Sequence, residues 1–134
     1  MQNNDLKVDI ENIKKLGVLS LGIGGVLAIM VSFDLYIAGL WGLVLTLAWA
    51  FSGGFYSQTL LKSGVTSEML NLALNGAILA AITEIAYDVL SGLILSIRFL
   101  TLSSFFSLSL FLQAAVVGAA TAVVWNVYQT NKKR

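Results

Sequence analysis

Charged residues are almost absent from the interior of this 134-residue chain, and that absence restricts its fold more than any other feature. Nine of the 15 charged residues lie in the first 15 or the last three positions, so residues 16–131 contain only six. Charged residues make up 11% of the chain, against about 25% in a typical soluble domain. So little polar material cannot cover a folded surface in water. The sequence therefore predicts an integral membrane protein.

Four apolar runs are long enough to cross a bilayer. They predict an all-α polytopic membrane protein with four transmembrane helices arranged as two hairpins. The expected spans are 16–33, 36–56, 69–97 and 105–128, which together form one transmembrane domain, 16–128. A cytoplasmic segment, 1–15, precedes this domain, and a basic cytoplasmic tail, 129–134, follows it. Tyr36 and Tyr56 bound the second run as in an aromatic belt, and the polar residues after it predict a loop over 57–67.

Basic residues are distributed unevenly between the two sides of the expected bundle. The N-terminal segment, the 57–67 loop and the tail share one side and hold seven Lys or Arg residues, whereas the other side holds only Arg98. Basic residues favour the cytoplasmic side, so both termini are expected to be cytoplasmic in a cell membrane. A five-span arrangement is rejected because it would place Arg98 within a span, where a charge is costly.

The first 15 residues allow two interpretations. Leu6, Ile10 and Ile13 fall at helical spacing and predict a short amphipathic helix on the inner membrane surface. The alternative is a partly ordered polar tail. Acidic residues dilute the basic character that a signal peptide requires, so the first span is expected to remain as a signal anchor.

Small residues recur at four-residue spacing in every run, and such stripes are typical of closely packed membrane helices. The predicted packing residues are Ser20, Gly24 and Ala28; Ala38, Gly42, Thr46 and Ala50; Gly76 and Ala80; and Ala114, Gly118 and Ala122. The stripes indicate a tightly packed bundle, or a bundle that docks onto partners.

Glu84 and Asp88 lie one turn apart in the third run and so share a helix face. Two carboxylates this close and out of water do not both ionise readily, so they would share a proton or be compensated by a cation or by Arg98. These three residues are the candidates for a proton or cation site. An alternative interpretation places both acids at the outer headgroup level as ordinary solvated charges. Their depth in the membrane decides between the two.

Other polar and aromatic residues in the spans have simpler interpretations. Asn71 and Asn75 are expected to contact headgroups near the cytoplasmic end, and Gln113 is expected to form an interhelical hydrogen bond. Trp41 and Trp49 are interpreted as anchors that face lipid or a partner. The connector 98–104 is unusually apolar and is expected to dip into lipid or to be covered by another protein.

Composition excludes several kinds of chemistry. The chain has no His and no Cys, so catalytic constellations, zinc sites and iron–sulfur clusters that need these residues cannot form. We expect no enzymatic activity, no cofactor and no metal site. A net charge of +1 also provides no electrostatic basis for binding nucleic acid.

Two functions fit these observations. The first is a non-enzymatic structural or accessory subunit of a larger membrane assembly or homo-oligomer, whose partners are the lipid bilayer and other membrane subunits or itself. The packing stripes, the apolar connector and the lack of a soluble domain favour it. The alternative is a small proton- or cation-coupled transporter or channel, including a holin-like pore, that uses Glu84 and Asp88.

Overall fold

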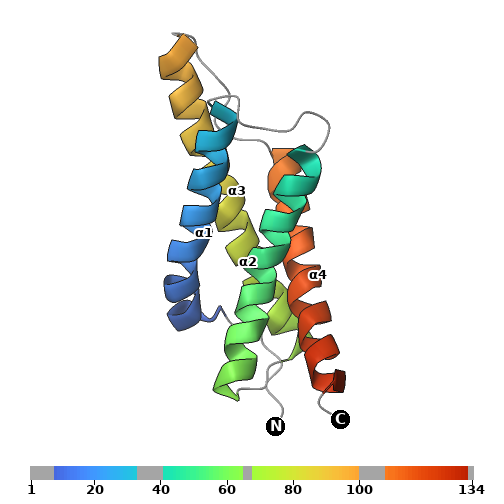
Figure 1. Ribbon diagram of the computed structural model, residues 1–134. Coiled ribbons are helices and arrows are strands. Elements are labelled where there is room, and N and C mark those ends of the chain that lie inside the picture. Colours follow the sequence, from blue (N-terminus) through green and yellow to red (C-terminus); the bar gives the residue numbers. More distant parts are fainter. Residues whose placement is uncertain (1–7, 33–40, 65–67, 100–107, 133–134) are drawn as a thin grey trace.

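In the computed structural model the chain folds into four α-helices (Figure 1). The structure describes residues 8–32, 41–64, 68–99 and 108–132. The helices are α1 (Ile10–Ser32), α2 (Trp41–Ser63), α3 (Met69–Phe99) and α4 (Leu108–Lys132). The predicted all-α class is therefore confirmed.

Three of the described helices are long and apolar enough to cross a membrane: Ile10–Val31, Met69–Ile97 and Leu108–Lys132. Large apolar side chains such as Val18, Leu70 and Val116 also point outward. Both features are compatible with a membrane protein. The described part of α2 is not among the three, and polar residues are concentrated in its last two turns. A crossing by α2 therefore stays a prediction.

The ends of two helices differ from the sequence predictions. α1 begins at Ile10, so this part of the expected N-terminal segment belongs to the first helix; Leu6 lies outside the described residues. The loop predicted over 57–67 is wrong at its start, because α2 continues to Ser63. The Ser57 hydroxyl donates to the Ala122 carbonyl, so α4 satisfies a polar group at the start of the predicted loop. Gly64 has a φ of 71° and occupies the position after α2 where glycine commonly ends helices.

α3 is the central helix of the bundle and contacts the other three. α1 packs mainly against α3 and touches α2 over a much smaller area, whereas α2 packs against both α3 and α4. The expected α1–α2 hairpin therefore contributes little to the packing. The start of α1, the end of α2, the start of α3 and the end of α4 lie at the same end of the bundle (Figure 1).

Gly118 of α4 lies where three helices meet. A Cβ at this position would collide with the Ala80 Cβ and the Gly76 carbonyl of α3, and a Cβ at Gly53 of α2 would collide with the Gly118 carbonyl. Gly24 brings α1 equally close to the Thr83 carbonyl of α3. Glycine thus allows the helix backbones to touch, which is how membrane helices gain packing energy without a hydrophobic drive.

Most of the predicted packing residues lie in these interfaces. Those of α1, α3 and α4 are all buried: Ser20, Gly24, Ala28, Gly76, Ala80, Ala114, Gly118 and Ala122.

The stripe predicted for α2 needs correction. Gly42 and Thr46 are exposed, Ala50 is half-buried, and Ala38 lies outside the described residues. The buried face instead carries Leu45, Ala48, Trp49, Ser52, Gly53, Tyr56, Ser57 and Leu60. Lipid accepts a small residue as readily as a neighbouring helix does, so spacing alone does not identify the packed face.

Gly118→Ala is expected to lower the free energy of unfolding by about 1–3 kcal/mol, because the new methyl group overpacks the α3–α4 crossing. Gly22→Ala is the matched control: nothing lies within 4 Å of a Cβ there, and a helical alanine is favoured over glycine by about 0.5–1 kcal/mol. Thermal unfolding in detergent, followed by circular dichroism, measures both changes. Equal stability of the two variants would contradict the close crossing.

Candidate functional site

Glu84 lies midway along α3 and is completely buried, with 0% of its surface exposed. Trp49 of α2, only 3% exposed, lies beside it. Trp49 also belongs to an apolar cluster formed by all four helices, whose other buried members are Leu27, Leu45, Ala48, Ala80 and Ala114. The carboxyl group is therefore enclosed by protein rather than by water.

Trp49 is the donor to the Glu84 carboxyl among the described residues: its indole Nε1 donates to Oε1 over 3.0 Å, and no N–H or hydroxyl group donates to Oε2. The Asp88 carboxyl also interacts with this group. A buried polar atom without a hydrogen bond costs about 1–3 kcal/mol, so it requires an explanation. The same bond corrects the interpretation of Trp49 as an outward anchor; the side chain of Trp41 lies outside the described residues. The indole N–H needs a buried partner, and Glu84 is the acceptor that α3 presents to it.

A pair of hydroxyl groups adjoins this carboxyl. Ser52 of α2 and Thr83 of α3 lie 2.7 Å apart, and both side chains are buried. Each hydroxyl also bonds to a carbonyl of its own helix, at Ala48 and Leu79 respectively. Together with the Trp49–Glu84 bond, the pair forms a polar α2–α3 contact in the middle of the bundle.

Asp88 lies one turn further along α3 and is 7% exposed. Neither acid lies on the outer surface of the protein. The alternative interpretation, in which both acids are solvated at the headgroup level, expects them to be exposed. Arg98 follows Glu84 by 14 residues, about 21 Å along a helix axis, in the last turn of α3. An arginine side chain is much shorter than that, so the helix does not bring Arg98 to Glu84. The Arg98 side chain itself lies outside the described residues.

The surroundings of Glu84 favour its neutral form. Within the described part of the chain, no Lys or Arg forms an ion pair with Glu84, and no three acidic residues gather as metal ligands. Burying an ionised carboxylate without a counter-charge is costly, and such a group normally takes up a proton instead. The arrangement suits a group that exchanges a proton between a buried site and its neighbours.

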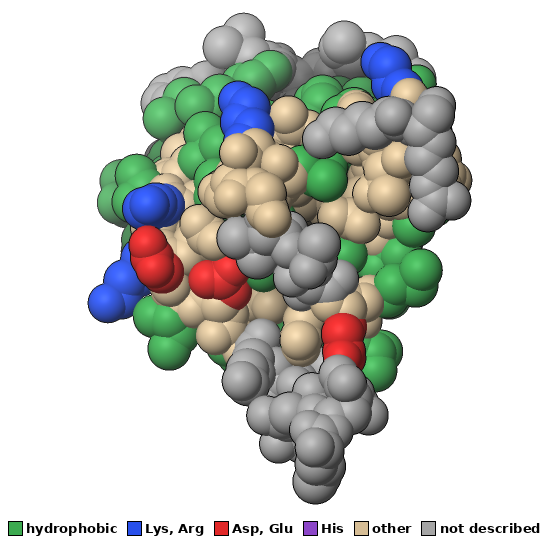
Figure 2. Space-filling model, turned by 90° about the horizontal axis from the view of Figure 1, so that it is seen from below, with side chains coloured by type: hydrophobic (Ala, Val, Ile, Leu, Met, Phe, Trp, Pro, Cys, Tyr) green, Lys and Arg blue, Asp and Glu red, His purple; other side chains and the backbone are tan. Residues whose placement is uncertain are grey.

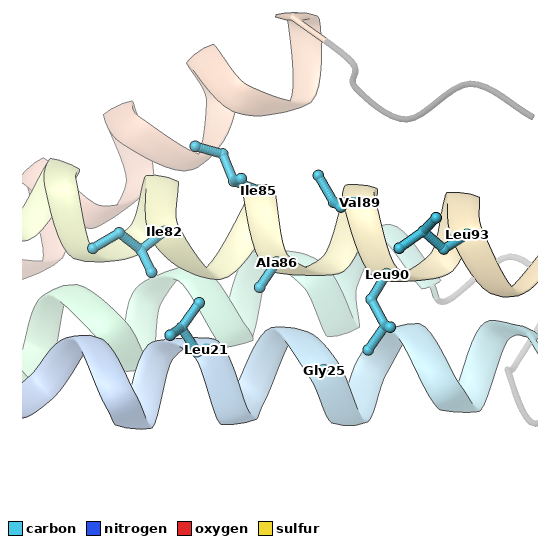
Figure 3. Close-up of a pocket in the computed structure, with 8 residues that line it drawn as sticks. All are labelled: Leu21, Gly25, Ile82, Ile85, Ala86, Val89, Leu90 and Leu93. Atoms are coloured by element: carbon cyan, nitrogen blue, oxygen red, sulfur yellow. The ribbon is translucent and has the colours of Figure 1, made fainter.

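An apolar groove beside α3 is separate from this carboxyl. A groove of about 510 Å³ runs between α1 and α3, and its lining residues are Leu21, Gly25, Ile82, Ile85, Ala86, Val89, Leu90 and Leu93 (Figure 3). All of them are apolar, and Glu84 is not among them. The groove therefore offers no chemistry to a polar substrate.

A second polar cluster, the Asp9 clamp, joins three helices at the end of the bundle where α1 begins. It consists of Asp9, Asn12, Tyr56 and Asn75. The Asp9 carboxylate caps α1 by accepting from the Asn12 amide, and it also accepts from the Tyr56 hydroxyl of α2 over 3.0 Å. The Asp9 amide donates to the Asn75 side chain of α3 over 2.7 Å. The clamp thus fixes the start of α1 to α2 and α3.

The clamp corrects two sequence interpretations. Asn75 is 1% exposed, so it does not contact headgroups; besides holding Asp9, it donates to the Asn71 carbonyl. Tyr56 is buried rather than part of an aromatic belt. An Asp just before a helical pattern is the standard N-cap signal, and it could have revealed Asp9 from sequence.

Gln113 also differs from its predicted role. Its side chain is exposed and donates to Ser109 of the same helix over 3.1 Å. The expected interhelical bond is therefore absent from the described residues. A local partner one turn away satisfies the amide at less entropic cost than a group on another helix.

Hydrogen bonding controls the charge of Asp9. Partial burial raises the pKa of this carboxyl, but hydrogen bonds from the Asn12 side chain, the Asn12 amide and the Tyr56 hydroxyl outweigh that effect. The pKa of Asp9 consequently lies below its ordinary value of 3.8. The clamp is anionic at neutral pH.

No protein-family model, curated protein or solved structure matches this chain. The function of the site therefore follows from its chemistry alone. The feature that requires explanation is a buried carboxyl group in the centre of an apolar bundle, with one oxygen that no described N–H or hydroxyl group donates to.

Asp9→Ala is expected to lower the free energy of unfolding by about 0.5–2 kcal/mol, because the cap is lost. Asp9→Asn keeps a capping oxygen and should retain most of the stability. Because the folded-state pKa is depressed, the contribution of the charge is complete above pH 3.8 and is lost as the pH falls through the folded-state pKa. The advantage of the wild type over Asp9→Asn should therefore shrink on acidification, measured by thermal unfolding in detergent.

Glu11→Ala is the control for this prediction, since it removes an exposed acid two positions away. The ion pair of Glu11 with Lys15 is exposed, so its loss should change the free energy of unfolding by no more than about 0.5 kcal/mol. An Asp9→Ala variant as stable as the wild type at neutral pH would show that the clamp does not hold α1.

Proposed function

We propose that this chain is a non-enzymatic integral membrane protein that moves protons across a bilayer, as a small proton channel or proton-coupled transporter. Glu84 is the residue that binds the proton, and Asp88 is its neighbour in transfer. One observation carries the proposal: Glu84 is fully buried and interacts with a second carboxyl, Asp88, while Trp49 donates to one of its oxygens and no described N–H or hydroxyl donates to the other. Ionisable residues inside a membrane are rare and usually functional.

A proton suits this site better than a metal cation. Na⁺ or Ca²⁺ requires several oxygen ligands arranged around it, and the described residues contain no cluster of three acidic side chains. Five grooves of the described structure are also lined without Glu84 or Asp88. Binding a proton to the carboxyl group requires no cavity for a ligand, and the bound proton neutralises the group directly.

The accessory-subunit function has less support from the same structure. One of the features that favoured it was the set of small-residue stripes, but Gly24, Gly76 and Gly118 make contacts within one bundle. The apolar connector at 98–104 lies almost wholly outside the described residues.

The proposal includes four spans with both termini in the cytoplasm of a cell membrane. Lys14, Lys15, Lys62 and Lys132 belong to the helix ends that meet at one end of the bundle, and Figure 2 views that end, where basic and acidic side chains are both visible. The last turn of α3, with Arg98, lies at the other end. Basic residues are more frequent on the cytoplasmic side of membrane proteins, so the end of the bundle that carries these lysines is favoured as the cytoplasmic one.

Glu84→Gln is expected to abolish proton transfer. Glutamine keeps the size of the side chain and an oxygen for Trp49, but it cannot exchange a proton. The measurement uses liposomes that contain the purified protein and an internal pH dye, with an inward-driving potassium diffusion potential. Wild-type liposomes should acidify faster than empty ones, and Glu84→Gln liposomes should acidify at the rate of empty ones.

Glu68→Gln is the matched control, because it makes the same change at the exposed start of the same helix and should keep the wild-type rate. Circular dichroism shows whether each variant is folded. Glu84→Gln liposomes that acidify as fast as the wild type would refute the role of Glu84, and wild-type liposomes no faster than empty ones would refute a proton channel.

A further inference from the structure

A groove of about 330 Å³ runs along the outside of the bundle between α2 and α4. Phe51 and Phe55 of α2 stack along one side, with ring centroids 6.2 Å apart, and Trp125 of α4 lies on the other. The remaining lining residues are Ala50, Gly54, Gln58 and Thr121. The groove has the dimensions and apolar character of a site for a hydrocarbon chain.

A small polar pocket of about 110 Å³ adjoins this groove at the end of α2. Gln58 lines both, and Leu61, Lys62 and Gln129 complete the pocket. The Trp125 indole donates to Gln58 Oε1 over 2.8 Å, so this bond lies where the apolar groove meets the polar pocket. Lys62 is exposed and forms no ion pair with the described acids. Its ammonium group is available to an anionic ligand.

This combination distinguishes the α2–α4 groove from the other apolar grooves of the described structure. The α1–α3 groove of Figure 3 is lined only by apolar residues. The α1–α2 groove, which includes Ile23, Val44 and Leu47, is apolar as well. Neither includes a basic side chain, so neither would select one lipid headgroup over another.

We propose that the α2–α4 groove binds one anionic phospholipid. An acyl chain lies along Phe51, Gly54 and Phe55, and the headgroup phosphate lies against Lys62 and Gln129. Lys62 belongs to the end of the bundle proposed to be cytoplasmic, and the cytoplasmic leaflet is the one that attracts basic residues through its anionic lipids. The polar pocket therefore lies at the depth of an anionic headgroup, and the groove extends from it toward the membrane core.

Gly54 makes room for the acyl chain. A Cβ at this position would meet the Thr121 side chain at 3.5 Å, which is ordinary contact, so the first carbon of a side chain fits without moving either helix. A leucine there would extend into the groove and occupy the space of the lipid. Gly54→Leu thus tests occupancy of the groove, whereas Lys62→Gln tests recognition of the headgroup.

The experiment measures quenching of Trp125 by brominated lipids in mixed liposomes. The protein carries Trp41→Phe, and Trp49 is buried inside the bundle, so Trp125 is the tryptophan accessible to the groove. Brominated phosphatidylglycerol should reach half-maximal quenching at about fivefold lower mole fraction than brominated phosphatidylcholine, since one lysine near an anionic lipid contributes about 1 kcal/mol. Lys62→Gln should abolish this preference, and Gly54→Leu should weaken quenching by both lipids.

Two control variants match these changes. Lys14→Gln removes an exposed lysine at the same end of the bundle, and Gly22→Leu adds a leucine at an open position of α1; both should retain the wild-type preference. Equal half-maximal quenching by the two lipids in the wild type, or a Lys62→Gln variant that keeps the preference, would overturn headgroup recognition. A Gly54→Leu variant that behaves like Gly22→Leu would overturn occupancy of the groove. These outcomes do not depend on proton transfer at Glu84.

Discussion

The close approach of helix backbones at glycine is the constraint on which the rest of this structure depends. Gly118 brings α4 into contact with Gly53 of α2 and Gly76 of α3, and Gly24 brings α1 against α3. Contacts of this kind exclude lipid and water from the middle of the bundle. Glu84 is buried because α3 is covered by the other three helices there.

Lipid provides no hydrophobic drive for helices to associate, so hydrogen bonds between helices contribute to the stability of the bundle. Trp49 and Glu84 join α2 to α3, the Ser57 hydroxyl and the Ala122 carbonyl join α2 to α4, and the Asp9 clamp joins α1 to α2 and α3. The carboxylate of the clamp has several donors, whereas Oε2 of Glu84 has no donor in the part of the chain that the structure describes. This difference separates a structural cluster from a candidate functional one.

The sequence was sufficient for the helical class and for most of the buried small residues, because apolar length and small-residue spacing are local properties of the chain. It was insufficient for the orientation of α2. Gly42 and Thr46 were expected to lie on a packed face but are exposed, and Trp49 was expected to face lipid or a partner but is buried within the bundle. In water, exposing a tryptophan side chain would cost free energy. In a membrane, both the lipid-facing side and the bundle-facing side of a helix can hold it. The orientation of Trp49 therefore depends on its hydrogen-bond acceptor, Glu84, which lies on another helix.

The central claim is that Glu84 carries a proton inside the folded bundle at neutral pH. Infrared spectroscopy of the protein in membranes tests it most directly, by comparing the wild type with Glu84→Gln and with the exposed control Glu68→Gln. The wild type and Glu68→Gln should both show the carbonyl stretch of a protonated carboxylic acid, and Glu84→Gln should lose it. If the band lost on substituting Glu84 is instead that of an ionised carboxylate, the site carries a charge and the account is wrong.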